Sequence, residues 1–284
     1  ADLVYMETKR NRLYLLEMNG SLVQSSSEIG RLETGQTVEG IADFGGDGLG
    51  DLLVSDLSGG ILEVWQLQAG RLSQSVIGTL GGEWVVAGVG DIGGDGLADV
   101  LVQHTPTGDL QAWETDAQGT TASIIGTLEQ DWVVTGINDL SCDGKADILF
   151  RDSVTGDVHV WEMGGSVPVE AATANLDRKW TIAGTADFVG DGKARVLLRH
   201  SDSGDLLVWD MASGDALPNN GIALDAKFVI QQLSDFTGDG KADILLRDSS
   251  SRKHKVYLLE NEGGLAYTSY VDELNRRWVV QPGD

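Results

Sequence analysis

Apolar residues along this chain come in short runs of four to six, and each run is bounded by Gly, Asp or Ser. In the stretch 132–176, these runs lie within "WVVTGIN", "DILFRD", "VHVWEM" and a looser "VPVEAATANL". Val, Ile and Trp are enriched in the runs, which are too short for helices. The pattern therefore predicts four β-strands in this stretch.

The same pattern recurs along the chain at a fixed spacing. Stretches similar to "DLSCDGKADILF", which begins at Asp139, also begin at positions 43, 91, 187 and 235, so successive starts are 48 residues apart. A period of roughly 40 to 50 residues is typical of propellers and solenoids. The triplet "TGD" at 155–157 predicts a hairpin turn between the second and third strands of its unit. Four antiparallel strands in each repeat predict the blade of a β-propeller.

The two ends of the chain set the expected number of repeats. The stretch 2–17, "DLVYMETKRNRLYLLE", matches the second and third strands of the unit, and the C-terminal "RWVVQPGD" matches a first strand. Joining these two fragments would complete a sixth unit and leave no free sheet edge in the ring. We therefore expect an all-β, six-bladed β-propeller of four-stranded antiparallel blades, a single domain over 1–284, with the closing blade split between the N- and C-termini.

An acidic loop lies between the first and second predicted strands of five units. We number these loops 1 (43–51), 2 (91–99), 3 (139–147), 4 (187–195) and 5 (235–243); Asp occupies the first, fifth and ninth positions and Gly the sixth, except at the ninth position of loop 4. Calcium takes six to eight oxygen ligands at about 2.3 to 2.6 Å, and carboxylates along a tightly turned loop can converge on one point. The seventh residue would add its backbone carbonyl, so its side chain can vary.

The predicted metal ligands follow from these positions. The side-chain ligands are Asp43, Asp47, Asp51, Asp91, Asp95, Asp99, Asp139, Asp143, Asp147, Asp235, Asp239 and Asp243. The backbone-carbonyl ligands are Leu49, Leu97, Lys145 and Lys241.

The loop followed by an apolar strand resembles the FG-GAP or VCBS-type repeat of integrin α-subunit propellers and many secreted propellers. The resemblance covers essentially the whole chain and implies a calcium loop of the pattern Asp, any, Asp or Asn, any, Asp, Gly, any, any, Asp. This sequence departs from that pattern at the third position, which is Gly45, Gly93, Ser141, Val189 and Thr237 in loops 1 to 5. With fewer side-chain ligands, calcium affinity is expected to be weak, on the order of 10⁻⁴ to 10⁻³ M.

Two further readings of the loops come from the same residues. The hydroxyls of Ser141 and Thr237 could add a ligand, which would make loops 3 and 5 the tightest sites. The alternative to metal binding is that the aspartates only cap turns through Asx-type hydrogen bonds. In loop 4 the ninth residue is Arg195; its guanidinium could pair with Asp187 and Asp191 and replace the cation, so we predict no metal there.

A second candidate site lies at the end of the second predicted strand, on the face opposite the acidic loops. One column of equivalent positions reads Met6, Ser55, Gln103, Arg151, Arg199 and Arg247, and the next reads Glu7, Asp56, His104, Asp152, His200 and Asp248. The arginines with their neighbours could bind an acidic sugar or a carboxylate-bearing peptide. The alternative is that these residues only order the following hairpin turn. The candidate ligand-binding residues are Arg151, Asp152, Arg199, His200, Arg247 and Asp248.

Composition narrows the class of partner. The chain has 20 basic and 44 acidic residues, a net charge of −24. This charge repels phosphate backbones, so nucleic acid and anionic membranes are poor partners and we expect neither nucleic-acid binding nor membrane insertion. The single cysteine, Cys142, excludes an internal disulfide. No apolar run approaches the roughly 20 residues that a membrane-spanning helix needs.

Three classes of function remain open from the sequence. The resemblance favours a non-enzymatic, calcium-binding recognition or adhesion module, a secreted or cell-surface monomer that binds a glycan or an extracellular protein. A scaffold module of a larger surface protein is the first alternative, because a repeat specifies architecture rather than function. A polysaccharide lyase or hydrolase is less favoured, since catalysis needs an asymmetric group of acid, base and charge stabiliser, whereas the residues here mostly obey the period.

Overall fold

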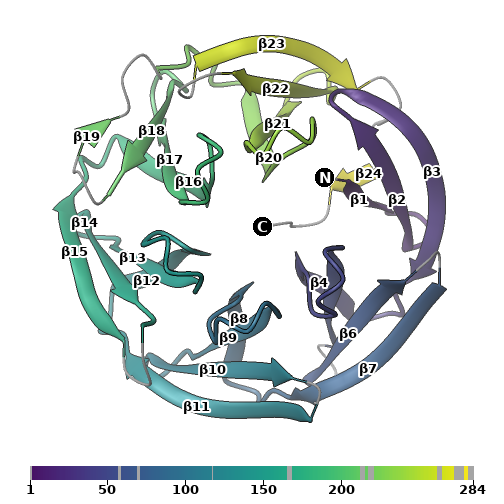
Figure 1. Cartoon of the computed structure of the whole chain (residues 1–284), viewed down its shortest axis with the longest axis vertical. Coiled ribbons are helices and arrows are strands. Elements are labelled where there is room, and N and C mark those ends of the chain that lie inside the picture. Colours follow the sequence, from purple (N-terminus) through teal and green to yellow (C-terminus); the bar gives the residue numbers. More distant parts are fainter. Residues whose placement is uncertain are drawn as a thin grey trace. The chain divides into compact units, whose positions relative to one another are not determined.

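The structure is a computed structural model, which describes residues 2–56, 59–68, 71–116, 118–164, 168–211, 215–216, 221–260, 264–271 and 278–280. In these residues the chain forms antiparallel β-sheets, and every sheet has four strands (Figure 1). The contacts divide the chain into two compact units. Unit 1 comprises Ala1–Arg31 with Leu176–Gly283, and unit 2 comprises Leu32–Asn175.

Unit 2 contains three sheets whose strands follow one another in chain order. The first sheet comprises β4 (Gln36–Ala42), β5 (Asp51–Asp56), β6 (Ile61–Gln68) and β7 (Arg71–Thr79). The second comprises β8 (Trp84–Gly90), β9 (Asp99–His104), β10 (Asp109–Asp116) and β11 (Gly119–Thr127). The third comprises β12 (Trp132–Asn138), β13 (Asp147–Asp152), β14 (Asp157–Glu162) and β15 (Val169–Asn175). The first strands β4, β8 and β12 are neighbours, and β7, β11 and β15 lie at the opposite edges (Figure 1).

Unit 1 contains two sheets of the same kind and one that joins the two ends of the chain. The first comprises β16 (Trp180–Ala186), β17 (Arg195–His200), β18 (Leu206–Asp210) and β19 (Asp215–Ala216). The second comprises β20 (Phe228–Ser234), β21 (Asp243–Asp248), β22 (His254–Glu260) and β23 (Gly264–Val271). The third has the order β24 (Trp278–Val280), β1 (Leu3–Glu7), β2 (Arg12–Asn19) and β3 (Leu22–Arg31). Pairing of Tyr5 with Val280 confirms the predicted joining of one C-terminal strand to N-terminal strands.

The strands lie where the apolar runs predict them, and burial explains why. The second strand of each repeat is apolar on both faces; in β13, the residues from Asp147 to Phe150 are all buried. Such a strand needs a covering layer on each side. On one side of β13 the second sheet of unit 2 provides it, because Ile148 and Phe150 pack in one cluster with Leu101. Fourth strands such as β11 carry mostly polar, exposed residues, as expected of a sheet edge.

Consecutive sheets within a unit pack closely because glycine stands at the contact between first strands. A Cβ atom at Gly40 would lie 2.9 Å from the Val89 side chain, and one at Gly88 would lie 2.6 Å from Ile137. The first strands β4, β8, β12, β16 and β20 also have a register shift at this point, between Val38 and Gly40 in β4. The local bulge and the missing side chain let the next sheet's aliphatic residue fill the gap.

The predicted six-bladed propeller has to be corrected. In the described part of the chain no sheet closes on itself: the six sheets are separate, and contacts gather them into two compact units of three sheets each. The period and the apolar pattern specify a four-stranded sheet and its packing on the next sheet, which are local properties. They do not specify closure, which depends on the angles between all the sheets. The supported class is all-β with six antiparallel sheets, and the single domain predicted from the period stays a prediction.

Candidate functional site

The first aspartates of the acidic loops are half-buried and the fifth aspartates are exposed, and both hold the loop backbone in its turn. In loop 1, Asp43 Oδ1 accepts the N–H groups of Gly45, Gly46 and Asp47 at 3.1, 2.6 and 3.2 Å, and Oδ2 accepts Gly48 N–H at 2.7 Å. Asp47 Oδ1 accepts Leu49 N–H at 3.0 Å. Loops 2, 3 and 5 repeat this arrangement. The loops are therefore shaped by Asx-type hydrogen bonds, whatever else they bind.

The ninth aspartate has a different environment, because it begins the buried second strand. Asp147 is fully buried; its Oδ2 accepts Leu140 and Ser141 N–H at 3.0 and 2.9 Å, and its Oδ1 accepts Met163 N–H at 3.2 Å. The carboxylate thus ties the loop to the end of the third strand. Burial raises the pKa of Asp147 to about 6, and does the same for Asp99 and Asp243. A nearby cation would favour the ionised form of all three groups.

Two buried oxygens in the loops have no hydrogen bond of good geometry among the described residues. They are Oδ2 of Asp51, a residue that is 1% exposed, and the hydroxyl of Ser141. In loop 5 the corresponding carboxylate oxygen accepts Phe236 N–H at 3.0 Å. Its counterpart in loop 1, Phe44 N–H, donates to Ala42 O at 3.1 Å and interacts only weakly with Asp51, whose pKa it lowers. Burial is the main cause that raises the pKa of Asp51, and Asp47 and Asp43 raise it further by repulsion. Desolvated acceptors without donors are costly, and a cation would satisfy them.

The three carboxylates of one loop are nevertheless not yet arranged as a metal centre. Among the described residues, no group of three or more His, Cys, Asp or Glu side chains lies close enough together to hold a metal ion. The predicted carbonyl-donating residues are placed by their N–H groups, which bond to the fifth aspartate in loops 1, 2, 3 and 5. These oxygen donors fit a weak calcium site in which the carboxylates would move toward the ion on binding. They fit a tight, preformed site poorly.

Loop 4 contains the predicted internal ion pair. Arg195 is 6% exposed, and its two terminal nitrogens donate to both carboxylate oxygens of Asp191 at 2.7 Å. Asp187 Oδ1 lies 3.7 Å from the guanidinium, and Asp210 Oδ2, which the sequence reasoning missed, lies 3.9 Å from it. Lys193 also pairs with Asp210 at 3.0 Å. The hydrogen bonds from Arg195 lower the pKa of Asp191 to about 2, so these carboxylates are neutralised by a side chain.

Consecutive acidic loops are joined by backbone hydrogen bonds within each unit. The residue before the ninth position donates its N–H to the carbonyl of the first aspartate in the preceding loop. This bond joins Ala98 to Asp43 at 2.8 Å, Ala146 to Asp91 at 2.7 Å and Ala242 to Asp187 at 2.7 Å. The position of each loop is therefore set in part by its neighbour.

The second candidate site uses its polar residues mainly to order turns. Asp152 Oδ1 accepts the N–H groups of Val154 and Thr155 at 2.7 and 2.8 Å. Asp248 Oδ1 likewise accepts the N–H groups of Ser250 and Ser251 at 2.8 and 2.9 Å. His200 Nδ1 accepts Ser203 N–H at 3.3 Å. These contacts match the turn-ordering alternative for this column.

The arginines of this site are not described as one cluster. Arg199 donates to the carbonyls of Ala226, at 3.1 Å, and Phe228 in the next sheet of unit 1. Burial lowers its pKa and that of Arg151. Arg151 belongs to unit 2, whereas Arg199 and Arg247 belong to unit 1.

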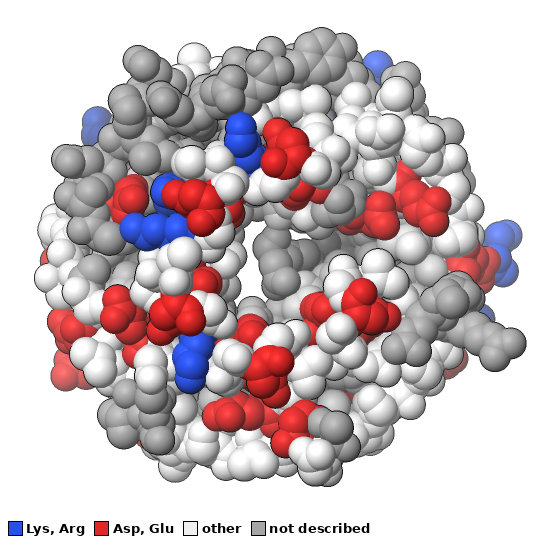
Figure 2. All heavy atoms as spheres, viewed as in Figure 1, with Lys and Arg blue, Asp and Glu red and all other residues white. Residues whose placement is uncertain are grey.

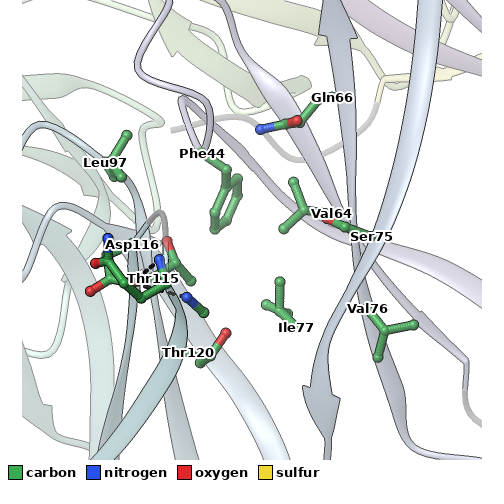
Figure 3. A pocket seen from close by; sticks show the side chains of 12 residues that line it. Phe44, Val64, Gln66, Ser75, Val76, Ile77, Leu97, Thr115, Asp116 and Thr120 are labelled. Atoms are coloured by element: carbon green, nitrogen blue, oxygen red, sulfur yellow. Dashed lines mark hydrogen bonds between the residues drawn. The ribbon is translucent and has the colours of Figure 1, made fainter.

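A cavity of about 410 Å³ lies between the first two sheets of unit 2, beside loops 1 and 2 (Figure 3). Figure 3 shows the ring of Phe44 between Leu97 of loop 2 and Val64 of β6. Polar groups on its rim include Gln66 and Thr120. The sequence reasoning missed this cavity because its residues come from five separated segments. The available signal was Gln66, which stands in a column that is otherwise acidic, with Glu17, Glu114, Glu162, Asp210 and Glu260.

The surface charge of the molecule follows its composition. Figure 2 shows Asp and Glu gathered at several places on the viewed face, with Lys and Arg at few. No helix in the described ranges is long and apolar enough to cross a membrane. A cationic ligand is therefore favoured electrostatically over an anionic one at most of this surface.

Comparisons with known proteins relate this chain to others by fold alone. No protein-family model matches the sequence, and no curated protein matches it significantly. A solved structure of a protein from Lactobacillus plantarum aligns with a TM-score of 0.58 at 13% identity, over 95% of this chain and 82% of that one. A functionally unknown protein from Desulfotomaculum acetoxidans aligns with a TM-score of 0.56 at 12% identity, over 100% and 90%.

A third similar structure is part of a much larger protein. A chain of the Photorhabdus luminescens Tc holotoxin pore aligns with a TM-score of 0.59 at 14% identity, over 94% of this chain but 14% of that chain. Identities this low carry no statement about activity. The resemblance to FG-GAP or VCBS-type repeats accordingly stays a prediction.

Proposed function

We propose that this chain is a calcium-binding, non-enzymatic recognition module, with weak calcium sites in loops 1, 2, 3 and 5. The observation that carries the proposal is the buried Oδ2 of Asp51, which has no hydrogen bond of good geometry among the described residues and belongs to the same loop as Asp43 and Asp47. Loop 4 supports it by contrast, because there a guanidinium neutralises the equivalent carboxylates. Calcium would supply charge neutralisation and oxygen coordination at the other loops.

Weak affinity also suits the proposed location. Sites with dissociation constants on the order of 10⁻⁴ to 10⁻³ M are typical of extracellular modules. We therefore place the chain outside the cell or at its surface as part of the same proposal.

A pair of matched variants tests the calcium sites. Asp47→Ala removes an exposed carboxylate that accepts one amide bond, so it should lower the number of bound calcium ions by one and leave the melting temperature in chelator nearly unchanged. Asp191→Ala, at the same position of loop 4, should leave the number of bound ions unchanged and lower the melting temperature, because it removes the carboxylate to which buried Arg195 donates two hydrogen bonds. Isothermal titration and equilibrium dialysis measure the ion count. Equal loss of calcium in both variants would refute the assignment.

The recognition role is proposed for the cavity of Figure 3. An apolar floor that includes Phe44 and a rim of amide, hydroxyl and carboxylate groups is suited to a sugar, which presents both apolar faces and hydroxyls. Because Phe44 and Leu97 belong to loops 1 and 2, calcium binding there would also order the cavity.

Glycan-array binding with and without chelator tests this part of the proposal. Gln66→Ala should weaken binding about tenfold, whereas Glu162→Ala, in the same column two repeats later, should leave it unchanged. Binding that neither variant nor chelator changes would exclude this cavity. A chain that binds calcium but no glycan or protein would favour the scaffold alternative.

A further inference from the structure

One arginine in unit 1 fills the junction between two consecutive sheets. Arg199, on β17, reaches the turn that precedes β20 and donates to the backbone carbonyls of Ala226, at 3.1 Å, and Phe228. The turn is closed by Phe228 N–H, which donates to Asp225 O at 3.0 Å. The guanidinium therefore satisfies two carbonyls that the turn points toward the neighbouring sheet.

The equivalent junction in unit 2 has the same turn but no arginine. Three repeats, or 144 residues, earlier, the counterpart of Arg199 is Ser55, and the counterparts of Ala226 and Phe228 are Gly82 and Trp84. The turn is closed in the same way, since Trp84 N–H donates to Gly81 O at 3.0 Å. The short side chain of Ser55 cannot span the distance that an arginine spans.

A cavity of about 540 Å³ opens at this junction, between the first two sheets of unit 2. Its lining includes Ser55, Gly82 and Trp84, the counterparts of the three residues that are in contact in unit 1. It is larger than a guanidinium group and has room for the alkyl chain of an arginine as well. The cavity thus lies where the corresponding junction of unit 1 holds Arg199.

The junction in unit 2 also differs in charge from the arginine-filled junction in unit 1. Glu39 on β4 lines the cavity and accepts a hydrogen bond from the Ser55 hydroxyl, whereas its counterpart in the arginine-filled junction is Ala183. Other repeats have Ala87, Thr135 and Gln231 at this position, so Glu39 is the only acidic residue in this column of equivalent positions. Asp56 adds a second carboxylate to the lining. This junction therefore carries an anion where the corresponding junction of unit 1 carries a cation.

We propose that this cavity binds a guanidinium group supplied from outside the chain, on an arginine side chain or a small guanidino compound. A guanidinium has five donors in a planar fork, which suits two turn carbonyls together with a carboxylate, and its flat face can stack on an indole such as that of Trp84. A lysine ammonium has a compact charge and fits this spread of acceptors less well. The site does not depend on the calcium proposal, because it uses none of the loop residues.

Titration with N-acetyl-arginine amide, followed by calorimetry and by the Trp84 indole N–H signal, tests the site directly. The wild-type chain should bind one equivalent, at least tenfold more tightly than the lysine analogue or the uncharged citrulline analogue. Ser55→Arg should abolish binding and keep or raise the melting temperature, because the chain then fills its own cavity. Glu39→Gln should weaken binding about tenfold. Equal binding of the citrulline analogue, or unchanged binding by Ser55→Arg or Glu39→Gln, would overturn the proposal.

The reciprocal change provides a second test that does not rely on the behaviour of Ser55→Arg. Arg199→Ser combined with Ala183→Glu should build a second cavity of the same kind, so the folded variant should bind two equivalents instead of one. A folded double variant that still binds one would count against the assignment. An arginine-containing peptide that binds more than tenfold better than the free amide identifies a partner protein as the source, and equal affinity identifies a small guanidino compound.

Discussion

Replacing Asp147 by alanine should destabilise the chain far more than replacing Asp143, although both are aspartates of one acidic loop. Asp147 is fully buried and accepts three backbone N–H groups, two of them in buried contacts to Leu140 and Met163. A buried donor left without a partner costs about 1–3 kcal/mol, so two cost about 2–6 kcal/mol. Removing a desolvated carboxylate recovers part of this, which leaves an expected loss of about 2–4 kcal/mol. Asp143 is exposed and accepts one amide bond, so its loss should be about 0.5–1 kcal/mol.

The assay is urea denaturation at pH 7 in the presence of a chelator, so that metal binding contributes nothing to the difference. Both variants should unfold with the slope of the wild type, and only the midpoint should move. Asp147→Asn is the control for shape, and it should recover part of the loss because its amide oxygen still accepts one N–H. Equal losses for the alanine variants of Asp147 and Asp143 in chelator would show that the ninth aspartate does not tie the loop to the third strand.

Three further predictions concern other parts of the same loops and sheets. Arg195→Asp should add one bound calcium ion in a titration, and an unchanged count would contradict the account of loop 4. Burial raises the pKa of the ninth aspartates of loops 2, 3 and 5 to about 6, above the unfolded value of 3.8. The folded chain therefore binds protons more tightly than the unfolded chain and loses stability as pH rises through about 4 to 6. In chelator the melting temperature should be higher at pH 5 than at pH 7, and the opposite order would refute the pKa shift. Gly126→Ala should cost about 1–3 kcal/mol, because the new Cβ would lie 2.7 Å from the Trp161 ring, whereas Gly221→Ala, with open space around it, should change the unfolding free energy by less than about 1 kcal/mol.

The sequence predicted the local structure well because the relevant signals are local. Apolar runs placed the strands, and glycine and aspartate placed the turns, as at Gly156, whose N–H donates to Asp152 O at 3.0 Å. The pairing of Arg195 with Asp191 was predictable because the two residues lie four positions apart in one loop. Closure of the sheets was beyond this reasoning, since it is a property of many packing angles at once.

Contacts between distant segments were also missed. Asp210 reaches Arg195 from the end of a different strand, and no spacing in the sequence distinguishes it from the other acids of its column. The sequence also carried no sign that Arg199 donates to two backbone carbonyls of the next sheet. The sequence shows Ser55 at the position that Arg199 occupies three repeats later. Only the contacts of Arg199 in the structure show which acceptors such an arginine would satisfy.

Backbone hydrogen bonds join successive loops, as from Ala98 N–H to Asp43 O. They couple the free energy of ordering one loop to that of the next. Repeat arrays with such links follow a one-dimensional Ising description, in which ordering one unit favours ordering of the adjacent one. Amide hydrogen exchange at Ala98 and Ala146 would report the state of the preceding loop in each case. A cation titration of joined loops should accordingly rise more steeply than that of independent sites, with a Hill coefficient above one.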